Sequence, residues 1–236
     1  MKLKNPFVLN GYAGAEYFCD REQETERLVR LLINGNNVVL MSQRRVGKTD
    51  LIRHLFSQKE IKEEFVTVYV DIYPTNNLME FISALSKAVT EALKPRGKDA
   101  IDKFINALAS LRSEISFDIN GFPTWGIGFG PQVRPEATLE EIFEYINKSK
   151  TPCIIAIDEF QQVSKYPNGT QIEALLRSYI QRTPYSRFIF SGSQRHVMAE
   201  MFASPARPFF QSSSMFGLPV IPKEVYIDFC EMWFKK

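Results

Sequence analysis

One short segment limits the possible folds of this chain more than any other. The all-apolar run Val38–Met41 is followed by the polar residues Ser42-Gln-Arg-Arg-Val-Gly-Lys-Thr49, and then by Leu51, Ile52 and Leu55 at helical spacing. The apolar run predicts a strand buried on both faces, and the spacing predicts a helix. A strand, a loop ending in Gly-Lys-Thr and a helix together are typical of a phosphate-binding loop.

The residues of this loop match the chemistry that a phosphate site needs. Gly47 lets the backbone approach the phosphate closely, Lys48 would reach the β- and γ-phosphates, and the Thr49 hydroxyl can ligate Mg²⁺. Ser42 stands where the pattern has its first glycine, so the start of the loop is expected to differ slightly. The other residues predicted to contact the nucleotide are Gln43, Arg44, Arg45, Val46 and Asp50.

The two loop arginines leave two interpretations open. Arg44 and Arg45 either contact phosphate or point outward toward a neighbouring subunit. We expect at least one to point outward, because Lys48 already supplies the central cation.

A second apolar run, residues 153–157, ends in Asp158 and Glu159. Adjacent carboxylates at the end of a buried strand are costly unless they bind something. Beside a phosphate loop, Asp158 is assigned to Mg²⁺ and Glu159 to orienting or deprotonating the attacking water. The structural alternative is a solvated loop after a strand.

A further strand, residues 187–190, follows the acidic strand in sequence and ends in Ser191-Gly-Ser193. In phosphate-loop ATPases with a catalytic glutamate, an added strand lies between the phosphate-loop strand and the acidic strand, and its end carries a polar sensor. Ser193 is the first choice for this sensor and Ser191 the second, with Gln194 and Arg195 adjacent. A plain Ser-Gly turn is the alternative.

Strand and helix patterns alternate along the chain, which predicts a three-layer α/β/α phosphate-loop fold with a parallel five-stranded sheet. Two segments flanking Asn120-Gly121, residues 115–119 and 122–129, predict an inserted β-hairpin. The other strands are expected at residues 65–72 and 214–220, and the other helices at 20–34, 78–93, 99–112, 171–181, 196–202, from 138 and from 223.

Composition excludes several classes of protein. Hydrophobic residues make up 44% and charged residues 24%, as in ordinary globular domains, and the net charge of +2 argues against a strongly basic nucleic-acid coat. Cys19, Cys153 and Cys230 are far apart, which argues against a disulfide framework or a zinc site. No stretch approaches 18 apolar residues, so no membrane span is expected and a cytoplasmic location is predicted.

Four motifs together resemble the archaeal-type ATPase family, which belongs to the AAA+/STAND branch of phosphate-loop NTPases. They are Phe18-Cys-Asp-Arg-Glu-Gln-Glu24, Arg44-Arg-Val-Gly-Lys-Thr49, Ile157-Asp-Glu-Phe160 and Phe190-Ser-Gly-Ser193. The resemblance covers residues 5–220 and implies that residues 18–22 pack against adenine, with Arg21 nearby. It also implies that Arg207 is an arginine finger or arginine sensor; an exposed loop arginine is the alternative.

The resemblance also implies a domain organisation. Residues 1–221 would form the ATPase core, with the hairpin insert at 115–130, and residues 222–236 the start of a helical lid. The rest of the lid and a winged-helix domain, through which the family binds nucleic acid, would be absent. The apolar face of Phe229, Met232 and Trp233 is expected to have nothing left in the chain to cover it.

Two functions follow from these residues. The first is hydrolysis of ATP to ADP with Mg²⁺; the absence of an Asn-Lys-x-Asp signature favours ATP over GTP. The second is a nucleotide-dependent switch with slow hydrolysis, whose output is DNA or protein binding through a missing C-terminal module, with a homo-oligomer or protein partner also open. A phosphate-loop kinase is a weaker third interpretation, because nothing marks a lid that binds an acceptor.

Overall fold

A computed structural model of the chain describes residues 5–7, 11–93, 115–117, 123–125 and 135–235. Its main sheet has the strand order β2-β5-β6-β1-β7, and every neighbouring pair runs parallel. The strands are β1 (Val38–Met41), β2 (Val66–Asp71), β5 (Cys153–Asp158), β6 (Ser186–Gly192) and β7 (Ser214–Gly217). The parallel five-stranded sheet is therefore confirmed, including the added strand β6 between the phosphate-loop strand and the acidic strand.

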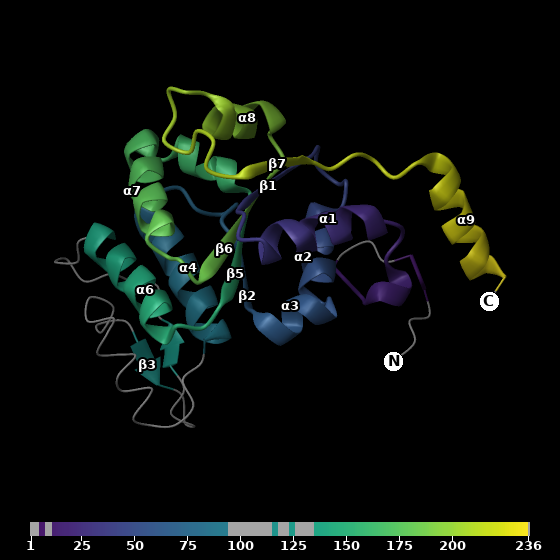
Figure 1. The fold of residues 1–236 in the computed structure, drawn as a ribbon, viewed down its shortest axis with the longest axis horizontal. Coiled ribbons are helices and arrows are strands. Elements are labelled where there is room, and N and C mark those ends of the chain that lie inside the picture. The colour runs from purple at the N-terminus through teal and green to yellow at the C-terminus, as the bar shows by residue number, and fades with distance from the viewer. Residues whose placement is uncertain (1–4, 8–10, 94–114, 118–122, 126–134, 236) are drawn as a thin grey trace.

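Helices cover both faces of this sheet (Figure 1). One face carries α1 (Glu22–Ile33), α2 (Lys48–Phe56) and α3 (Lys59–Glu64), and the other carries α4 (Leu78–Ala92), α6 (Pro135–Ser149) and α7 (Gly169–Gln181). The core is accordingly split into two apolar clusters, one on each side of the sheet. In β2, Val68 and Val70 belong to one cluster while Tyr69 packs against the other, as expected from the alternation of side chains along a strand.

Two short helices were not expected from the sequence. α3 has six residues, of which Ile61 alone is buried, so it offers no helical periodicity to detect. The 3-10 helix η3 (Phe160–Lys165) follows β5 directly and buries Phe160, Gln161 and Val163. A third element, the 3-10 helix η1 (Ala15–Tyr17), buries no residue.

The start of α6 corrects one prediction. A helix was expected to begin with a capping box at Thr138, but α6 begins three residues earlier, at Pro135. Proline suits the first position of a helix, because its fixed φ is helical and its missing N–H would have no partner there. Thr138 lies inside the first turns and is fully buried.

The inserted hairpin is present as β3 (Ile115–Phe117) paired antiparallel with β4 (Pro123–Trp125). The turn expected at Asn120-Gly121 and the helix expected at residues 99–112 lie outside the described residues.

A cluster of buried aromatic rings fixes the elements behind the carboxyl ends of the strands. It joins η3, β6, α8 (Arg195–Ala203) and the segment after α8 through Phe160, Phe190, Phe202 and Phe209, whose ring centroids lie 4.7–5.9 Å apart. All four rings are at most 2% exposed. The segments carrying Glu159 and Ser193 therefore rest on one packed unit.

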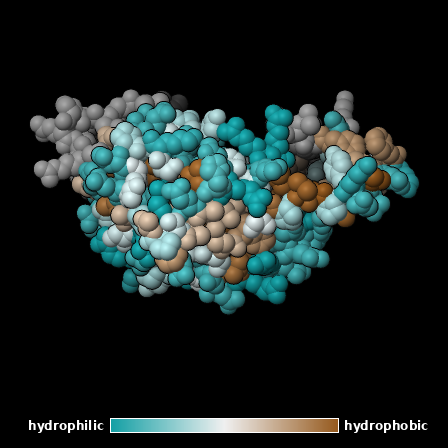
Figure 2. All heavy atoms as spheres, turned by 90° about the horizontal axis from the view of Figure 1, so that it is seen from above, coloured by the Kyte–Doolittle hydropathy of each residue, from teal (hydrophilic) through white to brown (hydrophobic). Residues whose placement is uncertain are grey.

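The last helix, α9 (Lys223–Phe234), stands apart from the sheet at one end of the molecule, near the N-terminal segment (Figure 1). Its apolar face was expected to lack any cover, and this expectation was wrong in part. Tyr17 stacks on Trp233 with ring centroids 5.1 Å apart, and Phe7 lies 6.5 Å from Phe229 and 5.6 Å from Phe234. Met232 remains 42% exposed. In Figure 2, apolar atoms gather where the segment with α9 projects from the rest of the molecule.

Candidate nucleotide-binding site

The loop of residues 42–49 joins β1 to α2, and its shape depends on two residues with positive φ. Arg45 has φ 64° and Gly47 has φ 88°, whereas Ser42 does not adopt a positive φ. Ser42 is 2% exposed, and its hydroxyl donates to the Gln43 carbonyl at 2.9 Å. Serine is therefore accommodated at this position because the backbone there needs no glycine.

Lys48 begins α2 and is buried inside the loop, with 6% of its surface exposed. Its Nζ donates to the Gln43 carbonyl oxygen at 3.3 Å. Burial lowers the pKa of Lys48, and the nearby Arg44 lowers it further, while the carboxylates of Glu159 and Asp158 oppose this shift. The ammonium group therefore lies at a helix N-terminus where a phosphate would supply the missing negative charge.

Asp158 ends β5 and faces the first turn of α2. The hydroxyl of Thr49 donates to Asp158 Oδ2 at 2.8 Å, so the two predicted metal ligands are brought together. The Tyr69 hydroxyl donates to the same oxygen at 2.7 Å. Tyr69 reaches it because Tyr69 is paired with Ala156 in the β2–β5 register, and residue 158 lies on the same face of β5 as residue 156.

Burial, with the Asp158 carboxylate adding to it, raises the pKa of the Tyr69 hydroxyl. This hydroxyl therefore stays a hydrogen-bond donor throughout the physiological pH range.

Glu159 directly follows β5 in a left-handed conformation, with φ 58°. Its Oε2 accepts a hydrogen bond from the Ser193 hydroxyl at 2.7 Å and another from Gln161 Nε2. Ser193, the first-choice sensor, directly follows β6 and is therefore in contact with the predicted catalytic carboxylate. Ser191 is fully buried in the strand, and Gln194 and Arg195 begin α8.

Next to the loop lies a cavity of about 240 Å³. It is lined by the N-terminal segment, the phosphate loop and α9: Pro6, Phe7, Tyr17, Phe18, Cys19, Arg21, Arg45, Val46, Gly47, Asp50, Ile221, Tyr226 and Phe229. Phe18 forms one wall and is stacked on His54, with ring centroids 4.4 Å apart. Burial raises the pKa of Asp50, against the opposing effect of Arg53.

Arg21 holds this wall in place. It is 3% exposed, and its guanidinium donates to Glu24 at 2.8 Å and to the Pro219 carbonyl at 2.7 Å. A third, longer hydrogen bond of 3.4 Å reaches the Val46 carbonyl in the phosphate loop. Arg21 thus joins the start of α1, the phosphate loop and the segment before α9.

The two loop arginines are both exposed. The Arg44 guanidinium lies 5.6 Å from the ring centroid of Tyr73, and Arg45 lines the cavity beside the loop.

Arg207 lies with acidic side chains rather than with the phosphate loop. Among the described residues, its ion pairs are with Glu173, which is fully buried, and with Glu200 at 3.3 Å. Within one copy of the chain it therefore connects α7, α8 and the segment after α8.

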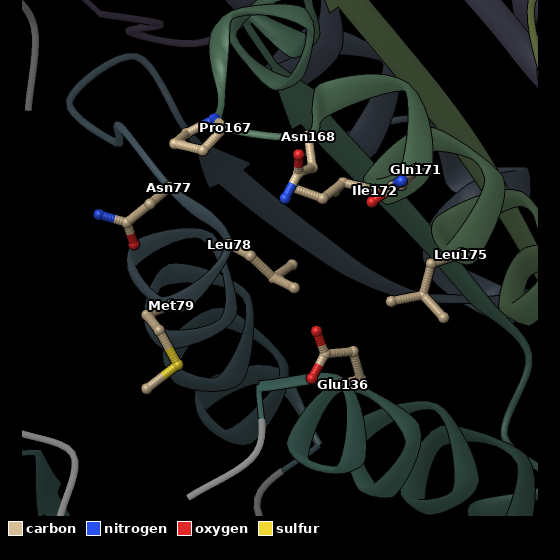
Figure 3. A pocket seen from close by; sticks show the side chains of 9 residues that line it. All are labelled: Asn77, Leu78, Met79, Glu136, Pro167, Asn168, Gln171, Ile172 and Leu175. Carbon is tan, nitrogen blue, oxygen red and sulfur yellow. The ribbon is translucent and has the colours of Figure 1, made fainter. Parts of the chain in front are cut away.

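A larger cavity, of about 480 Å³, lies where α4, α6 and α7 begin (Figure 3). No phosphate-loop residue lines it, and its walls are mostly apolar. The lining residues are Asn77, Leu78, Met79, Glu136, Pro167, Asn168, Gln171, Ile172 and Leu175.

The donor set beside the phosphate loop fits Mg²⁺. Thr49 and Asp158 offer a hydroxyl and a carboxylate oxygen 2.8 Å apart, and Mg²⁺ prefers one or two such ligands together with substrate phosphates and water. Within the described part of the chain, no group of three or more His, Cys, Asp or Glu side chains could hold a metal by itself. A magnesium site here would therefore depend on the nucleotide.

A parallel sheet with a phosphate loop, and with Asp158, Glu159 and Ser193 meeting at its carboxyl edge, defines a phosphate-loop ATPase fold. The comparison with protein families agrees: residues 18–207 match the family described as an ATPase domain predominantly from Archaea. The chain belongs to this family.

Relatives and solved structures point the same way. An uncharacterized ATP-binding protein of Methanocaldococcus jannaschii is 27% identical over an alignment of 188 positions, and the match covers 70% of this chain and 49% of that protein. The Walker-type ATPase of Pyrococcus abyssi matches with a TM-score of 0.65 at 19% identity, over 98% of this chain and 62% of that one. The ADP form of the Aeropyrum pernix Orc2 protein matches with a TM-score of 0.61 at 17% identity, over 98% and 55%.

The likeness to the two solved structures confirms the fold. The chain spans about half the length of the curated relative and less than two thirds of these two structures. No helix among the described residues is long and apolar enough to cross a membrane.

Two residues of the site were missed by sequence reasoning. Tyr69 belongs to a strand whose alternation was recognised, but its contact with Asp158 depends on the β2–β5 register, which a single sequence does not reveal. Gln161 follows the acidic pair by two residues, and only the unexpected 3-10 helix turns it back toward Glu159.

Proposed function

We propose that this chain binds ATP with Mg²⁺ and hydrolyses it to ADP and phosphate. The observation that carries the proposal is the 2.8 Å contact between Thr49 and Asp158, beside a buried Lys48 at the N-terminus of α2. Lys48 and Thr49 begin the helix that follows β1, whereas Asp158 ends β5, far away in the sequence. Their meeting supports the proposal, because a cation and two oxygen donors lie together beside a helix N-terminus.

Each residue then has a defined task. Lys48 and the loop N–H groups would bind the β- and γ-phosphates, and Thr49 and Asp158 would hold Mg²⁺. When bound, Mg²⁺ would neutralise part of the negative charge on the phosphate oxygens. Glu159 would orient the attacking water and accept its proton while the water oxygen bonds to the γ-phosphorus and ADP leaves. Ser193 lies beside Glu159, where a γ-phosphate could be sensed.

The cavity beside the loop is proposed to hold the base. Its walls of Phe18, Tyr17, Tyr226 and Phe229 offer aromatic surface for a purine, and Arg21 fixes those walls rather than touching solvent. ATP is proposed over GTP because the guanine signature is absent from the sequence.

The strand order supports an AAA+/STAND type of ATPase, because β6 separates β1 from β5 and Ser193 directly follows it. Arg207 would act as an arginine finger only by reaching a neighbouring copy, since within one copy it pairs with Glu173 and Glu200.

The test is to compare ATP binding and phosphate release for the wild-type chain and Lys48→Ala, with Lys62→Ala as a control on an exposed face of α3. We expect wild type and Lys62→Ala to release phosphate only with Mg²⁺, and Lys48→Ala to lose ATP affinity at least tenfold. Equal ATP affinity in wild type and Lys48→Ala would contradict the proposal.

A nucleotide-dependent switch is the second candidate, and one observation favours it. The base cavity is lined both by the N-terminal segment and by Tyr226 and Phe229 of α9, so a bound base would contact the helix that leads out of the core. Such a switch would work through slow hydrolysis and through DNA or protein binding, by a module that follows α9 or by self-association. Orc1 of Aeropyrum pernix, solved in complex with DNA, shares the fold with a TM-score of 0.56 at 15% identity.

Addition of DNA or of a partner protein tests the two candidates against each other. Turnover that rises on addition indicates a remodelling ATPase, whereas slow turnover with ADP retained indicates the switch.

A further inference from the structure

We propose that Gln161 is a positioning residue that holds the Glu159 carboxylate against the end of β6. The proposal rests on the function proposed above, because it assigns Gln161 a task only if Glu159 acts on the attacking water. Gln161 would touch neither nucleotide nor water and would act through Glu159 alone.

The hydrogen bonds to the Glu159 carboxylate form the clamp through which Gln161 would act. Oε2 accepts from both Ser193 Oγ, at 2.7 Å, and Gln161 Nε2. The second proton of the Gln161 amide points toward Ser193 Oγ, 3.5 Å away, so the three polar groups form a triangle. Two donors on one carboxylate oxygen restrict the rotation of the carboxylate and would leave Oε1 for the attacking water.

The orientation of the Gln161 amide follows from its surroundings. Its Oε1 is buried without a hydrogen-bond partner among the described residues. If the amide were turned over, Oε1 would face the Glu159 carboxylate and Nε2 would lose its acceptor. Neither amide atom would then be satisfied. An orphaned buried acceptor is costly, and a native structure keeps one where another interaction compensates.

Gly192 provides the space for this arrangement. A Cβ at Gly192 would lie 2.6 Å from Gln161 Oε1 and 2.5 Å from the Met198 side chain, both closer than real Cβ contacts. Gly192 has no positive φ, so the need for glycine here is spatial. The end of β6, just before Ser193, thus leaves room for the Gln161 side chain to lie against it.

The support behind Gln161 is buried and closely packed. Gln161 is 1% exposed, and its neighbour Phe160 is fully buried in the aromatic cluster with Phe190, Phe202 and Phe209. Gln162, the next residue, instead donates to the Tyr73 carbonyl at 3.1 Å and takes no part in the triangle. The two adjacent glutamines therefore form a matched pair for substitution.

The experiment compares Gln161→Met with Gln162→Met. Methionine keeps the length and volume of glutamine but removes the amide donor. We expect Gln161→Met to lower the single-turnover rate of ATP hydrolysis about ten- to a hundredfold, the loss of one hydrogen bond to a charged group. The Kd for ATP and the urea midpoint should stay at their wild-type values, and Gln162→Met should hydrolyse ATP at the wild-type rate.

A second background separates positioning from a structural role. In Glu159→Ala, the further change Gln161→Met should leave the residual rate unchanged, because the group it positions is gone. Three results would each overturn the proposal: a Gln161→Met rate within twofold of wild type, the same fold-loss in the Glu159→Ala background, or a matching loss of ATP affinity or of the urea midpoint.

Failure of the proposed function would be visible separately, as absence of hydrolysis by the wild-type chain. The clamp is then judged from the NMR signals of the Gln161 side-chain amide in the nucleotide-free protein. We expect these protons to exchange slowly and to shift in Glu159→Ala but not in Glu224→Ala, an exposed control on α9. Signals that do not respond to Glu159→Ala would overturn the clamp.

Discussion

At the level of single residues, the site gathers groups that are individually unfavourable for folding. Lys48 is a buried cation, Asp158 is a carboxylate that is 4% exposed, and Glu159 adopts a left-handed conformation without being glycine. Burying charge and holding such a conformation both cost free energy unless something is gained elsewhere. A nucleotide with its metal would supply the charges that these residues lack.

Lys48→Met should therefore stabilise the nucleotide-free chain. We expect the free energy of unfolding at pH 7 to rise by about 1 kcal/mol, the usual scale of such trade-offs between stability and activity. The folded-state pKa of Lys48 is lowered from 10.5, so the folded chain binds fewer protons than the unfolded chain between the two values. The loss of folding stability that Lys48 causes in the wild-type chain should therefore shrink as the pH rises from the lowered pKa toward 10.5.

Urea unfolding at pH 7 and pH 10 measures this difference. A Lys48→Met chain that is less stable than wild type at pH 7, without nucleotide, would show that the buried ammonium stabilises the fold.

Tyr69→Phe should weaken magnesium binding without removing a predicted ligand. Tyr69 donates to the Asp158 oxygen that would face the metal, and removing such an outer partner costs metal sites roughly tenfold in affinity. The Mg²⁺ concentration for half-maximal phosphate release should rise by about that factor. Tyr185→Phe, at a tyrosine that is 48% exposed, is the control. An unchanged Mg²⁺ requirement in Tyr69→Phe would exclude this role.

At the level of elements, one ion pair ties α7 to the segment beyond α8. Glu173 on α7 is fully buried, and burial raises the pKa of its carboxyl, while Arg207 opposes the shift. Arg207 itself is 17% exposed and also contacts Glu200. Removing Arg207 would leave a buried carboxylate without its cation, which is a large cost.

Arg207→Ala should lower the free energy of unfolding by about 3 kcal/mol at pH 8. The folded-state pKa of the Glu173 carboxyl lies above its ordinary value of 4.5. The folded chain therefore loses stability as the pH rises through the window between these two pKa values. Without the guanidinium this window widens, so the Arg207→Ala penalty should be smaller at pH 5 than at pH 8.

Urea unfolding at pH 5 and pH 8 checks the pH dependence, with Arg30→Ala on the exposed side of α1 as the control. A penalty for Arg207→Ala that is equal at both pH values, or no larger than that of Arg30→Ala, would exclude the buried pair. Hydrolysis rates of Arg207→Ala are meaningful as a test of an arginine finger only under conditions where the variant is folded.

At the level of the whole molecule, the two ends of the described chain meet beside the phosphate loop. Tyr17 stacks on Trp233, and Phe7 contacts both Phe229 and Phe234. Tyr17, Phe7 and Phe229 also line the base cavity. A base bound there would therefore change the surroundings of α9.

Trp233 should report this change. In a Trp125→Phe chain, Trp233 is the remaining tryptophan, and its emission should change when ATP is added. In the double variant Trp125→Phe/Lys48→Ala, the Trp233 emission should not change at ATP concentrations that saturate the Trp125→Phe chain. Unchanged emission at saturation, with binding followed independently by calorimetry, would show that α9 does not respond to nucleotide.

The sequence was sufficient to predict the parts of the site that depend on local order. The buried run before Ser42 and the run before Asp158 predicted strands β1 and β5, and a parallel sheet brings their carboxyl ends to one edge. What it could not predict depends on the relative placement of elements. Three such contacts join residues far apart in the chain: the Arg207–Glu173 ion pair, the Tyr69 contact with Asp158, and the packing of Phe7 and Tyr17 on α9.

Glu159→Gln provides the most direct test of the proposed hydrolysis. Glutamine keeps the shape of the side chain but cannot accept the proton of the attacking water. With radiolabelled ATP and Mg²⁺ in a single turnover, Glu159→Gln should bind ATP with wild-type affinity and convert it at least a hundredfold more slowly. Conversion at the wild-type rate, with ATP bound equally well, would contradict hydrolysis by this carboxylate.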